Sequence, residues 1–288
     1  MDFDATLATL LRQIPRGRYA TCGAIARALG DVAASRAVAE RVLAVSALPR
    51  RDGVATADGR RLVDRRRVTG ETFAGFRGAA FLSRLRRRQL RDRERLVLSG
   101  HLPVQNVGGI DVAYEGDTAF AAAVITDPQG NHVVDVALAK TRVSFPYIPG
   151  YLAFRELPVL RLAWRRLRVR PDVLLVDGHG IAHPAGFGVA CAASFALEVP
   201  TIGVAKSRLV GTAGEETERK KLRPLTVDGE HRGWILTSAP RARPIFLSPG
   251  NRVSVNQCAD IIPPLCKRRI PEPLRIADTL SKTMKRGK

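Results

Sequence analysis

The stretch Val107-Gly108-Gly109-Ile110-Asp111-Val112-Ala113-Tyr114 opens the part of the chain that decides the fold. It has the apolar character of a strand, with one acid inside it. Two further strand patterns follow, at 119–126 and 133–143, after short joins rich in Gly, Asp, Asn and Pro. Short joins of this kind favour antiparallel hairpins. The sequence therefore predicts three antiparallel strands at the start of a sheet.

Helical and strand patterns then alternate as far as residue 262. We expect a helix at 150–168, a buried strand at 173–176, a helix at 186–197 and a strand at 201–205. Later strands are expected at 233–237 and 244–247, and a last helix at 254–262. Three antiparallel strands followed by helix–strand alternation predict an α/β fold, a ribonuclease H-like mixed sheet with flanking helices.

The first 62 residues read instead as a small helical module. Apolar residues recur at helical spacing: Phe3, Leu7, Leu10, Leu11 and Ile14. Thr21 is expected to cap a second helix that Gly30 ends, and Ser35 a third. This order is compatible with a helix-turn-helix DNA-binding domain, and a plain interaction domain is the alternative. We expect domains at 1–75 and 76–288, with 76–95 as an arginine-rich connecting segment.

The charge of the chain is strongly positive. Lys and Arg number 47 against 27 Asp and Glu, a formal net charge of +20. Such an excess predicts attraction to polyanions, of which nucleic acid is the commonest, and a surface kept basic for solubility is the alternative. Arginines crowd residues 60–95, where they suit phosphates; a solvated helical face is the other interpretation.

Four cysteines, Cys22, Cys191, Cys258 and Cys266, form no C-x-x-C pair and have no zinc-like histidine spacing. They are expected to be reduced and mostly buried. The acidic N-terminus lacks an apolar signal core, and no apolar run approaches the roughly 20 residues that span a bilayer. We therefore expect a cytoplasmic, soluble monomer with no membrane partner.

Three carboxylates stand where a carboxylate is unfavourable. Asp111 lies inside the first strand, and Asp177 ends the apolar run 173–176. Glu156 has Leu152 four residues before it and Leu160 four after, which puts it on an apolar helical stripe. A bound divalent cation would stabilise such acids, and hard oxygen ligands favour Mg²⁺ or Mn²⁺ over zinc. The alternative for each acid is an ordinary cap or salt bridge.

Three other side chains are candidates for chemistry or binding. His183, in a turn six residues after Asp177, could orient or deprotonate a water, or it could be a surface histidine. Lys206, just past a strand, could hold a phosphate, or be a solvated lysine. Tyr147 sits in a stiff double-proline turn, where an exposed ring could wedge into a base stack; a core tyrosine under a loop is the alternative.

At this point the sequence resembles the endonuclease V family. The resemblance covers about residues 95–270 and rests on five stretches in order: Val107 to Tyr114, quoted above, Pro146-Tyr-Ile-Pro-Gly-Tyr-Leu-Ala-Phe-Arg-Glu156, Val176-Asp-Gly-His-Gly-Ile-Ala-His-Pro184, Pro200-Thr-Ile-Gly-Val-Ala-Lys206 and Ser248-Pro-Gly-Asn-Arg-Val-Ser254. It implies a ribonuclease H-like fold. It also implies hydrolysis of the second phosphodiester bond 3′ of deoxyinosine, with Mg²⁺, for which Mn²⁺ can substitute.

The resemblance also implies residue roles. Asp111, Glu156 and Asp177 would be metal ligands, His183 would assist the water or the metal site, and Lys206 would contact phosphate. DNA-binding residues would come from two places, the strand-separating wedge at Pro146, Tyr147 and Ile148 and the flipped-base pocket at Gly178 and Gly180. In one departure, Ala185 stands where the family usually has an arginine, so a phosphate or packing contact of the family is in doubt here.

The N-terminal module is similar to the DNA-binding domain of O6-alkylguanine alkyltransferases and alkyltransferase-like proteins. The matching stretches are Ile14-Pro-Arg-Gly17, Thr21-Cys-Gly-Ala-Ile-Ala26 and Ala34-Ser-Arg-Ala-Val38. Arg36 falls where that family places its base-displacing arginine, and Thr21 would contact DNA beside it. The acceptor motif Pro-Cys-His-Arg is absent, and Cys22 replaces a usual tyrosine, so alkyl transfer is not expected.

These observations together predict a DNA repair endonuclease whose N-terminal domain adds DNA binding. Its partner would be DNA containing deoxyinosine or other damaged bases. Two rival hypotheses stay open at the level of sequence. One is a ribonuclease of the same fold acting on inosine in RNA; the other is a lesion-binding protein without catalysis.

Overall fold

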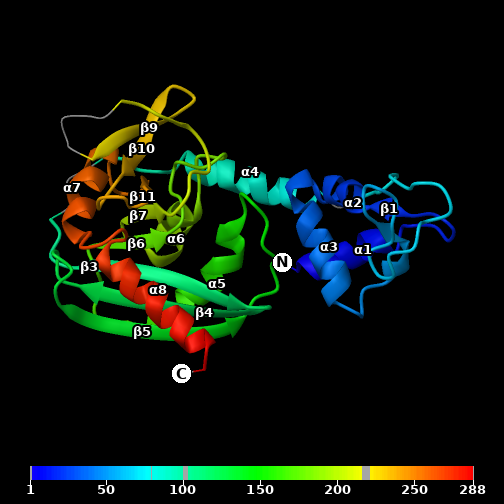
Figure 1. Ribbon diagram of the computed structural model, residues 1–288, viewed down its shortest axis with the longest axis horizontal. Coiled ribbons are helices and arrows are strands. Elements are labelled where there is room, and N and C mark those ends of the chain that lie inside the picture. Colours follow the sequence, from blue (N-terminus) through cyan, green and yellow to red (C-terminus); the bar gives the residue numbers. More distant parts are fainter. Residues whose placement is uncertain (1, 79, 100–102, 216–220, 288) are drawn as a thin grey trace. The chain divides into compact units, whose positions relative to one another are not determined.

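A computed structural model describes residues 2–78, 80–99, 103–215 and 221–287 of the chain (Figure 1). The chain divides into two compact units. The first comprises Met1–Arg88 and Ser144–Tyr151, and the second comprises Gln89–Val143 and Leu152–Lys288. The loop 144–151 therefore packs with the first unit, although both segments that flank it in the sequence belong to the second.

The first unit is built mainly from short helices. Its elements are α1 (Phe3–Leu11), β1 (Ala20–Thr21), α2 (Cys22–Leu29), the 3-10 turn η1 (Val32–Ala34), α3 (Ser35–Ala44), the 3-10 turn η2 (Arg51–Gly53) and β2 (Val54–Ala55), with β1 and β2 paired in parallel. The next helix, α4 (Phe81–Arg93), begins in this unit and ends in the second. Helix α4 confirms that part of the arginine-rich segment is helical, and residue 79, where the predicted helix began, lies outside the described residues.

The ends of α2 are as the sequence predicts. The Thr21 hydroxyl oxygen accepts a hydrogen bond from the amide of Ala24, which satisfies one of the free donors of the first turn. Gly30 ends the helix at a φ of 103°, in the left-handed region that favours glycine.

The predicted cap at Ser35 is wrong. The turn η1 runs directly into α3, so Ser35 is already the first helical residue, and Ala34 precedes it without a side-chain cap. The Ser35 hydroxyl donates to the carbonyl of Val32 at 2.6 Å. The capping function passes to Asp31, whose carboxylate accepts from the amide of Ala33 at the start of the turn.

The second unit is a mixed α/β structure. Its strands and helices in chain order are β3 (Val107–Glu115), β4 (Thr118–Thr126), β5 (Val133–Arg142), α5 (Leu152–Arg166), β6 (Val173–Asp177), α6 (Val189–Leu197), β7 (Thr201–Ala205), β8 (Thr212–Ala213), β9 (Leu222–Val227), β10 (Glu230–Leu236), β11 (Ile245–Asn251), α7 (Val255–Leu265) and α8 (Glu272–Lys285). The sheet order is β5-β4-β3-β6-β7-β11-β10-β9-β8. The pairs β3–β4 and β4–β5 are antiparallel, as predicted, whereas β3–β6 and β6–β7 are parallel.

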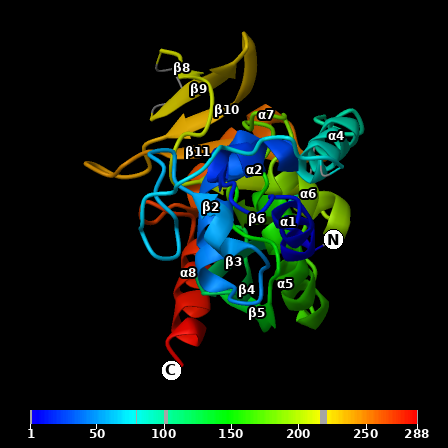
Figure 2. The same cartoon turned by 90° about the vertical axis from the view of Figure 1, so that its right-hand side faces the viewer.

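Helices cover both faces of this sheet, so alternate residues of a strand enter different cores. In β4, Ala121 and Ala123 pack with α5 and α6, whereas Ala122 and Val124 pack with α8. In Figure 1, α8 crosses β3 and β4, and Figure 2 shows these strands between α8 and α5. The predicted mixed α/β fold with flanking helices is confirmed.

The prediction that the chain's last helix ends near residue 262 is wrong, because α8 follows α7. The prolines Pro271 and Pro273 resemble helix breakers in the sequence. Pro273, however, lies in the first turn of α8, where the missing N–H is not needed for helical hydrogen bonding. The strands β8 and β9 were also not predicted.

Candidate metal centre

Asp111 and Asp177 meet because their strands are parallel neighbours. Ile110 of β3 is the register partner of Val176 of β6, and each acid is the next residue along its strand. Asp111 is 6% exposed, whereas Asp177 lies at the end of β6 and is partly exposed. The carboxyl end of a parallel strand pair is where open α/β sheets place their ligands.

A third carboxylate joins them from the C-terminal helix. One oxygen from each of Asp111, Asp177 and Asp278 lies within 4.8 Å of the others. Asp278 is in α8, which packs against β3 and β4. This residue was missed in the sequence, although Leu274 and Ala277 mark an apolar face of its helix, the same kind of signal that singles out Glu156.

Glu156 is buried at the same place. It is 8% exposed in α5, and burial raises its pKa well above the ordinary value, with Asp177 and Asp111 adding repulsion. Burial likewise raises the pKa of Asp111 to about 7, with a further contribution from Asp177. Acids that disfavour each other's ionisation in this way are close in space. The sequence hypothesis that the three acids converge is thus supported by their mutual electrostatics.

Two lysines form ion pairs with the carboxylates of this cluster. Lys206 Nζ lies 2.5 Å from Asp177 Oδ2 and 2.9 Å from Asp278 Oδ1, so this lysine is not simply solvated. Lys282 Nζ lies 2.6 Å from the other oxygen of Asp278. Two lysine ammonium groups are therefore paired with the carboxylates of the cluster. The carboxylate oxygens are the atoms available to bind a metal ion. Such hard donors fit Mg²⁺ or Mn²⁺.

Gly109 allows α8 to reach the cluster. A Cβ added at this position would lie 2.3 Å from the carbonyl carbon of Pro273 and 2.5 Å from the amide nitrogen of Leu274. Gly109 and Asp111 are two residues apart in β3 and so face the same side of the sheet, toward α8. The glycine thus lets the backbone of α8 approach the strand that bears Asp111.

His183 lies in the loop that follows β6. It is 5% exposed, which rules out the surface histidine of the alternative interpretation. Its Nδ1 accepts a hydrogen bond from the amide of Ala185 at 3.1 Å. An accepting Nδ1 means that the neutral ring carries its proton on Nε2, which is then the nitrogen able to donate.

Close packing requires glycine at two positions of the same loop. Gly178 has a φ of 143°, and a Cβ there would lie 2.5 Å from Val189 Cγ1. At Gly180 a Cβ would lie 2.0 Å from the carbonyl oxygen of Pro249. The amide of Gly180 also donates to Ser248 Oγ at 2.9 Å, which ties the loop to β11. Both glycines therefore have a structural role, whatever they contact in a substrate.

The proposed wedge residues lie in the first unit. Tyr147 is 56% exposed, between the buried Pro146 and Ile148, so it is not the core tyrosine of the alternative interpretation. A hydrogen bond anchors the loop that carries Tyr147, because the Tyr151 hydroxyl donates to Asp31 Oδ2 at 2.7 Å. An exposed ring on an anchored loop is suited to contact with a base.

The other two predicted DNA-binding residues are also in this unit. Arg36 is exposed on α3 and pairs with Glu40 at 2.7 Å, which raises its pKa; Tyr147 is near enough to add to this effect. The Thr21 hydroxyl, in contrast, caps α2. The structure therefore brings Arg36 and Tyr147 near each other, although more than a hundred residues separate them.

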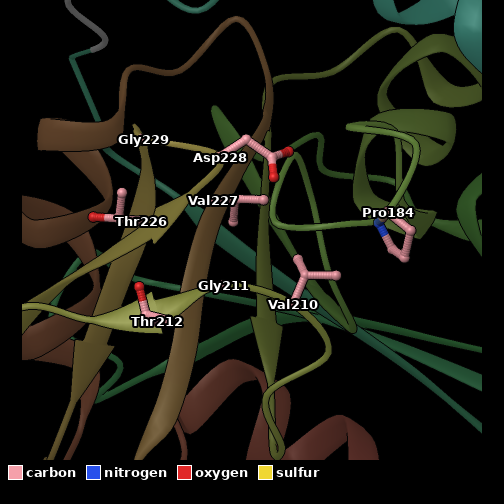
Figure 3. Close-up of a pocket in the computed structure, with 8 residues that line it drawn as sticks. All are labelled: Pro184, Val210, Gly211, Thr212, Thr226, Val227, Asp228 and Gly229. Carbon is pink, nitrogen blue, oxygen red and sulfur yellow. The ribbon is translucent and has the colours of Figure 1, made fainter.

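A separate hollow of about 490 Å³ lies in the second unit (Figure 3). It is lined by Pro184, Val210, Gly211, Thr212, Thr226, Val227, Asp228 and Gly229. Pro184 directly follows His183, but none of the clustered carboxylates lines this hollow. It is therefore distinct from the candidate metal centre.

A mixed sheet with carboxylates gathered at the ends of parallel strands, and a lysine among them, defines the class of metal-dependent enzymes that act on phosphate esters. The endonuclease V family profile matches residues 88–279. Endonuclease V of Thermofilum pendens is 41% identical over 210 residues, which are 72% of this chain and 90% of that protein. The chain belongs to the endonuclease V family and is a metal-dependent DNA repair endonuclease.

Solved structures agree with this assignment. Endonuclease V from Streptomyces avermitilis is 34% identical with a TM-score of 0.67, covering 75% of this chain and 96% of its own. Endonuclease V from Ciona intestinalis is 26% identical with a TM-score of 0.64, covering 72% and 98%. That protein was crystallised with a 24mer DNA containing an inosine followed by a ribo-adenosine. Among the described residues of the present chain, no helix is long and apolar enough to cross a membrane.

Proposed function

We propose that the protein hydrolyses the second phosphodiester bond 3′ of deoxyinosine in DNA, with Mg²⁺ as the metal and Mn²⁺ as a substitute. The observation that carries this proposal is the cluster of Asp111, Asp177 and Asp278 beside the buried Glu156. Burial and neighbouring carboxylates disfavour the ionised forms of Asp111 and Glu156, and a bound cation would stabilise both as carboxylates. The inosine-containing DNA bound by the Ciona intestinalis relative supports the choice of substrate.

The roles of the side chains follow from their chemistry. Asp111, Glu156 and Asp177 would hold the ion, and Asp278 would join them as a fourth ligand. When bound, a divalent ion activates water and stabilises negative charge on a phosphate. His183 would donate from Nε2 to the water or to the leaving oxygen. Lys206 would exchange its contacts with the carboxylates for a substrate phosphate.

The remaining parts of the proposal concern substrate binding. The order β5-β4-β3-β6-β7 supports a ribonuclease H-like sheet. Gly178 and Gly180 would border the flipped base, and Pro146, Tyr147 and Ile148 would separate the strands. We place the domains at 1–75 and 76–288, with the arginine-rich connecting segment 76–95 at the start of the second, in a monomer.

The N-terminal domain would add DNA binding of an alkyltransferase-like kind, without alkyl transfer. Arg36 and Thr21 would contact the duplex. The electrostatic interaction between Arg36 and Tyr147 supports one DNA-facing surface that includes both. The helical order of α1, α2 and α3 is compatible with a helix-turn-helix arrangement.

The test is cleavage of a labelled duplex with a single deoxyinosine, in Mg²⁺, in Mn²⁺ and in chelator. Wild-type protein should nick one nucleotide beyond the lesion on the 3′ side in either metal, and not in chelator. Asp177→Ala should lose the nick. Glu115→Gln, which removes an exposed acid from the same strand as Asp111, should retain it. Tight inosine binding without a nick in any metal would leave a lesion-binding protein.

A second candidate substrate is inosine in RNA, because the DNA bound by the Ciona intestinalis relative has a ribo-adenosine after the inosine. The same assay with a ribonucleotide at that position, and with all-RNA substrates, separates the two. Cleavage of RNA much faster than of DNA would favour the ribonuclease.

A further inference from the structure

The first unit contains a hollow of its own, with a volume of about 250 Å³. Its lining residues define what we call the arginine pocket: Arg16, Gly17, Arg18, Tyr19, Arg50, Asp52, Gly53, Arg61, Val68 and Thr69. All of them belong to the first unit, whereas the clustered carboxylates belong to the second. The pocket is thus separate from the candidate metal centre.

A tight turn forms one wall of the pocket. The amide of Arg18 donates to the carbonyl of Pro15 at 3.2 Å, and Gly17 takes the left-handed φ of 78° that such a turn requires. No atom lies within 4 Å of a Cβ built on Gly17, so the turn borders open space. The turn η2, which follows Arg50, forms a second wall of the pocket. Arg50 itself has a φ of 52°, which is unusual for a residue other than glycine.

The side chains around the pocket are mostly cationic. Four arginines line it, and Asp52 is the one acid among the lining residues. Arg18 is balanced by Glu71 at 2.7 Å, and Arg61 has a long ion pair with Asp64, at 3.8 Å. The local excess of positive charge favours an anionic ligand.

Two of these arginines have donors without an acceptor. In the described part of the chain, the Nε atoms of Arg50 and Arg61 are buried and have no hydrogen-bond partner. Arg50 Nη2 donates to the carbonyl of Pro15 at 2.8 Å, which fixes its guanidinium against the turn. Buried donors without partners are rare and unfavourable, so each one requires an explanation. An oxyanion in the pocket would supply the acceptors.

The size of the pocket limits what it can take. Sites for drug-sized molecules begin at about 300 Å³, and this pocket is smaller. The planar fork of arginine matches phosphate oxygens, and it can bind them with two parallel hydrogen bonds. A phosphate group satisfies the volume, the charge and the geometry of the donors together.

We propose that the arginine pocket binds a phosphate group, held by Arg16, Arg50 and Arg61. In the assignment that follows from the proposed DNA-binding role of the N-terminal domain, and rests on it, this is a backbone phosphate of the bound duplex. Asp52 weakens the site by repulsion and so limits its affinity.

The experiment uses the full chain, in chelator so that no DNA is cut. Inorganic phosphate is titrated into the labelled protein, and the amide resonances of Gly17 and Gly53 report occupancy. The affinity for an undamaged duplex is measured in parallel, across a range of salt concentrations. The variants are Arg16→Gln, Arg61→Gln and Asp52→Asn, with Arg12→Gln as the matched control. Arg12 is an exposed arginine of the same unit outside the pocket, so it controls for loss of charge alone.

Phosphate should shift both amides in the wild type and in Arg12→Gln. Arg16→Gln and Arg61→Gln should each weaken phosphate binding about tenfold, the size expected for a hydrogen bond to a charged group. Asp52→Asn should strengthen it, a direction that no folding defect produces. If duplex affinity changes in parallel, the phosphate belongs to the DNA backbone. The salt dependence of duplex binding should then correspond to about one phosphate contact fewer in each of the two arginine variants.

A different result separates the two proposals. If inorganic phosphate responds as expected while duplex affinity stays the same in all variants, the pocket takes free phosphate, and its assignment to DNA binding fails. If phosphate shifts neither amide, or if Arg16→Gln and Arg61→Gln behave like Arg12→Gln, the arginine pocket is not a phosphate site.

Discussion

Ser281 Oγ lies 2.8 Å from Asp111 Oδ2, a contact between residues 170 positions apart in the chain. The same hydroxyl is 3.1 Å from the carbonyl of Asp278, one turn earlier in α8. A hydroxyl has a single proton to donate, and a carboxylate is the stronger acceptor. Ser281 is fully buried, so no water competes for the bond. The C-terminal helix therefore contributes both a carboxylate to the cluster and a group that orients Asp111.

Ser281→Ala should weaken metal binding more than it slows cleavage. Without the hydroxyl, Asp111 loses the group that fixes one of its oxygens, a contact of about 1.5 kcal/mol or more. We expect the Mg²⁺ concentration for half-maximal cleavage to rise roughly tenfold, with the rate at saturating metal little changed. Ser281→Thr, which keeps the hydroxyl, is the control. Equal metal requirements in wild type and Ser281→Ala would show that the bond does not position Asp111.

Gly109→Ala should lower both stability and activity. The added methyl would meet backbone atoms of Pro273 and Leu274, which cannot rotate away. Overpacking of this kind destabilises by about 1–3 kcal/mol. The displaced α8 would carry Asp278 and Ser281 with it, so cleavage should fall as well. Thermal unfolding and nicking assays on one preparation measure both effects.

Gly108→Ala is the comparison for this prediction. Its added methyl would meet side-chain atoms of Leu174, Pro171 and Ile125, at 2.8 Å or more, rather than backbone. Gly108 also faces away from the side of the strand that bears Asp111. Gly108→Ala should therefore destabilise the protein without lowering its metal affinity selectively, as Gly109→Ala is expected to do. The same metal requirement in both variants would contradict a specific role for Gly109 in placing α8.

Much of the second unit could be predicted because its signals are local. The strands β3, β4 and β5 follow one another through short turns, so their pairing requires only neighbouring sequence. Asp111 and Asp177 were recognised because each is an acid in an apolar strand. Their meeting then follows from the parallel register of β3 and β6.

The part contributed by α8 could not be predicted in the same way. Asp278 joins the cluster only because α8 folds back onto β3, a contact that depends on the missing side chain at Gly109. No local pattern in residues 272–285 predicts that α8 packs against β3. Lys206 is a similar case, since its two partners, Asp177 and Asp278, come from separate elements. Long-range convergence, together with the helix α8 itself, is what the local sequence patterns did not predict.

The contribution of Asp111 to the stability of the metal-free protein should fall as the pH rises from about 4 to 7. Burial, with Asp177 adding to it, raises the pKa of Asp111 from 3.8 to about 7. The folded state therefore binds this proton more tightly than the unfolded chain does, so its stabilising effect is complete below pH 3.8 and is lost as the pH rises through about 7. Glu156, whose pKa is also raised, acts in the same direction.

Thermal unfolding in chelator at several pH values measures this dependence. Asp111→Asn, which has no proton to lose, should lack this loss of stability with rising pH, so its stability relative to the wild type should increase from pH 4 to pH 7. Added Mg²⁺ should stabilise the wild type more at pH 8 than at pH 5, because the ion binds the deprotonated carboxylates. Wild-type and Asp111→Asn stabilities that change in the same way with pH over this range would contradict the raised pKa of Asp111.

Lys206→Gln should bind metal more tightly and yet cleave more slowly. In the metal-free protein the ammonium contacts Asp177 and Asp278, so an arriving cation must displace it from both. Removing the lysine removes this competition, and the affinity for Mn²⁺, measured by calorimetry, should rise several-fold. The proposed contact to a substrate phosphate is lost at the same time, so the rate at saturating metal should fall by one to two orders of magnitude, the range expected for losing a charged contact.

Lys282→Gln separates these two effects. Within the described part of the chain, the ion pair of Lys282 is with Asp278, at 2.6 Å, and its side chain is more exposed than that of Lys206. It should change metal affinity slightly and leave the saturated rate near that of the wild type. If Lys206→Gln instead weakened metal binding, its ammonium would be supporting the carboxylates rather than competing for them. The slower cleavage would then follow from loss of the metal and not from loss of a phosphate contact.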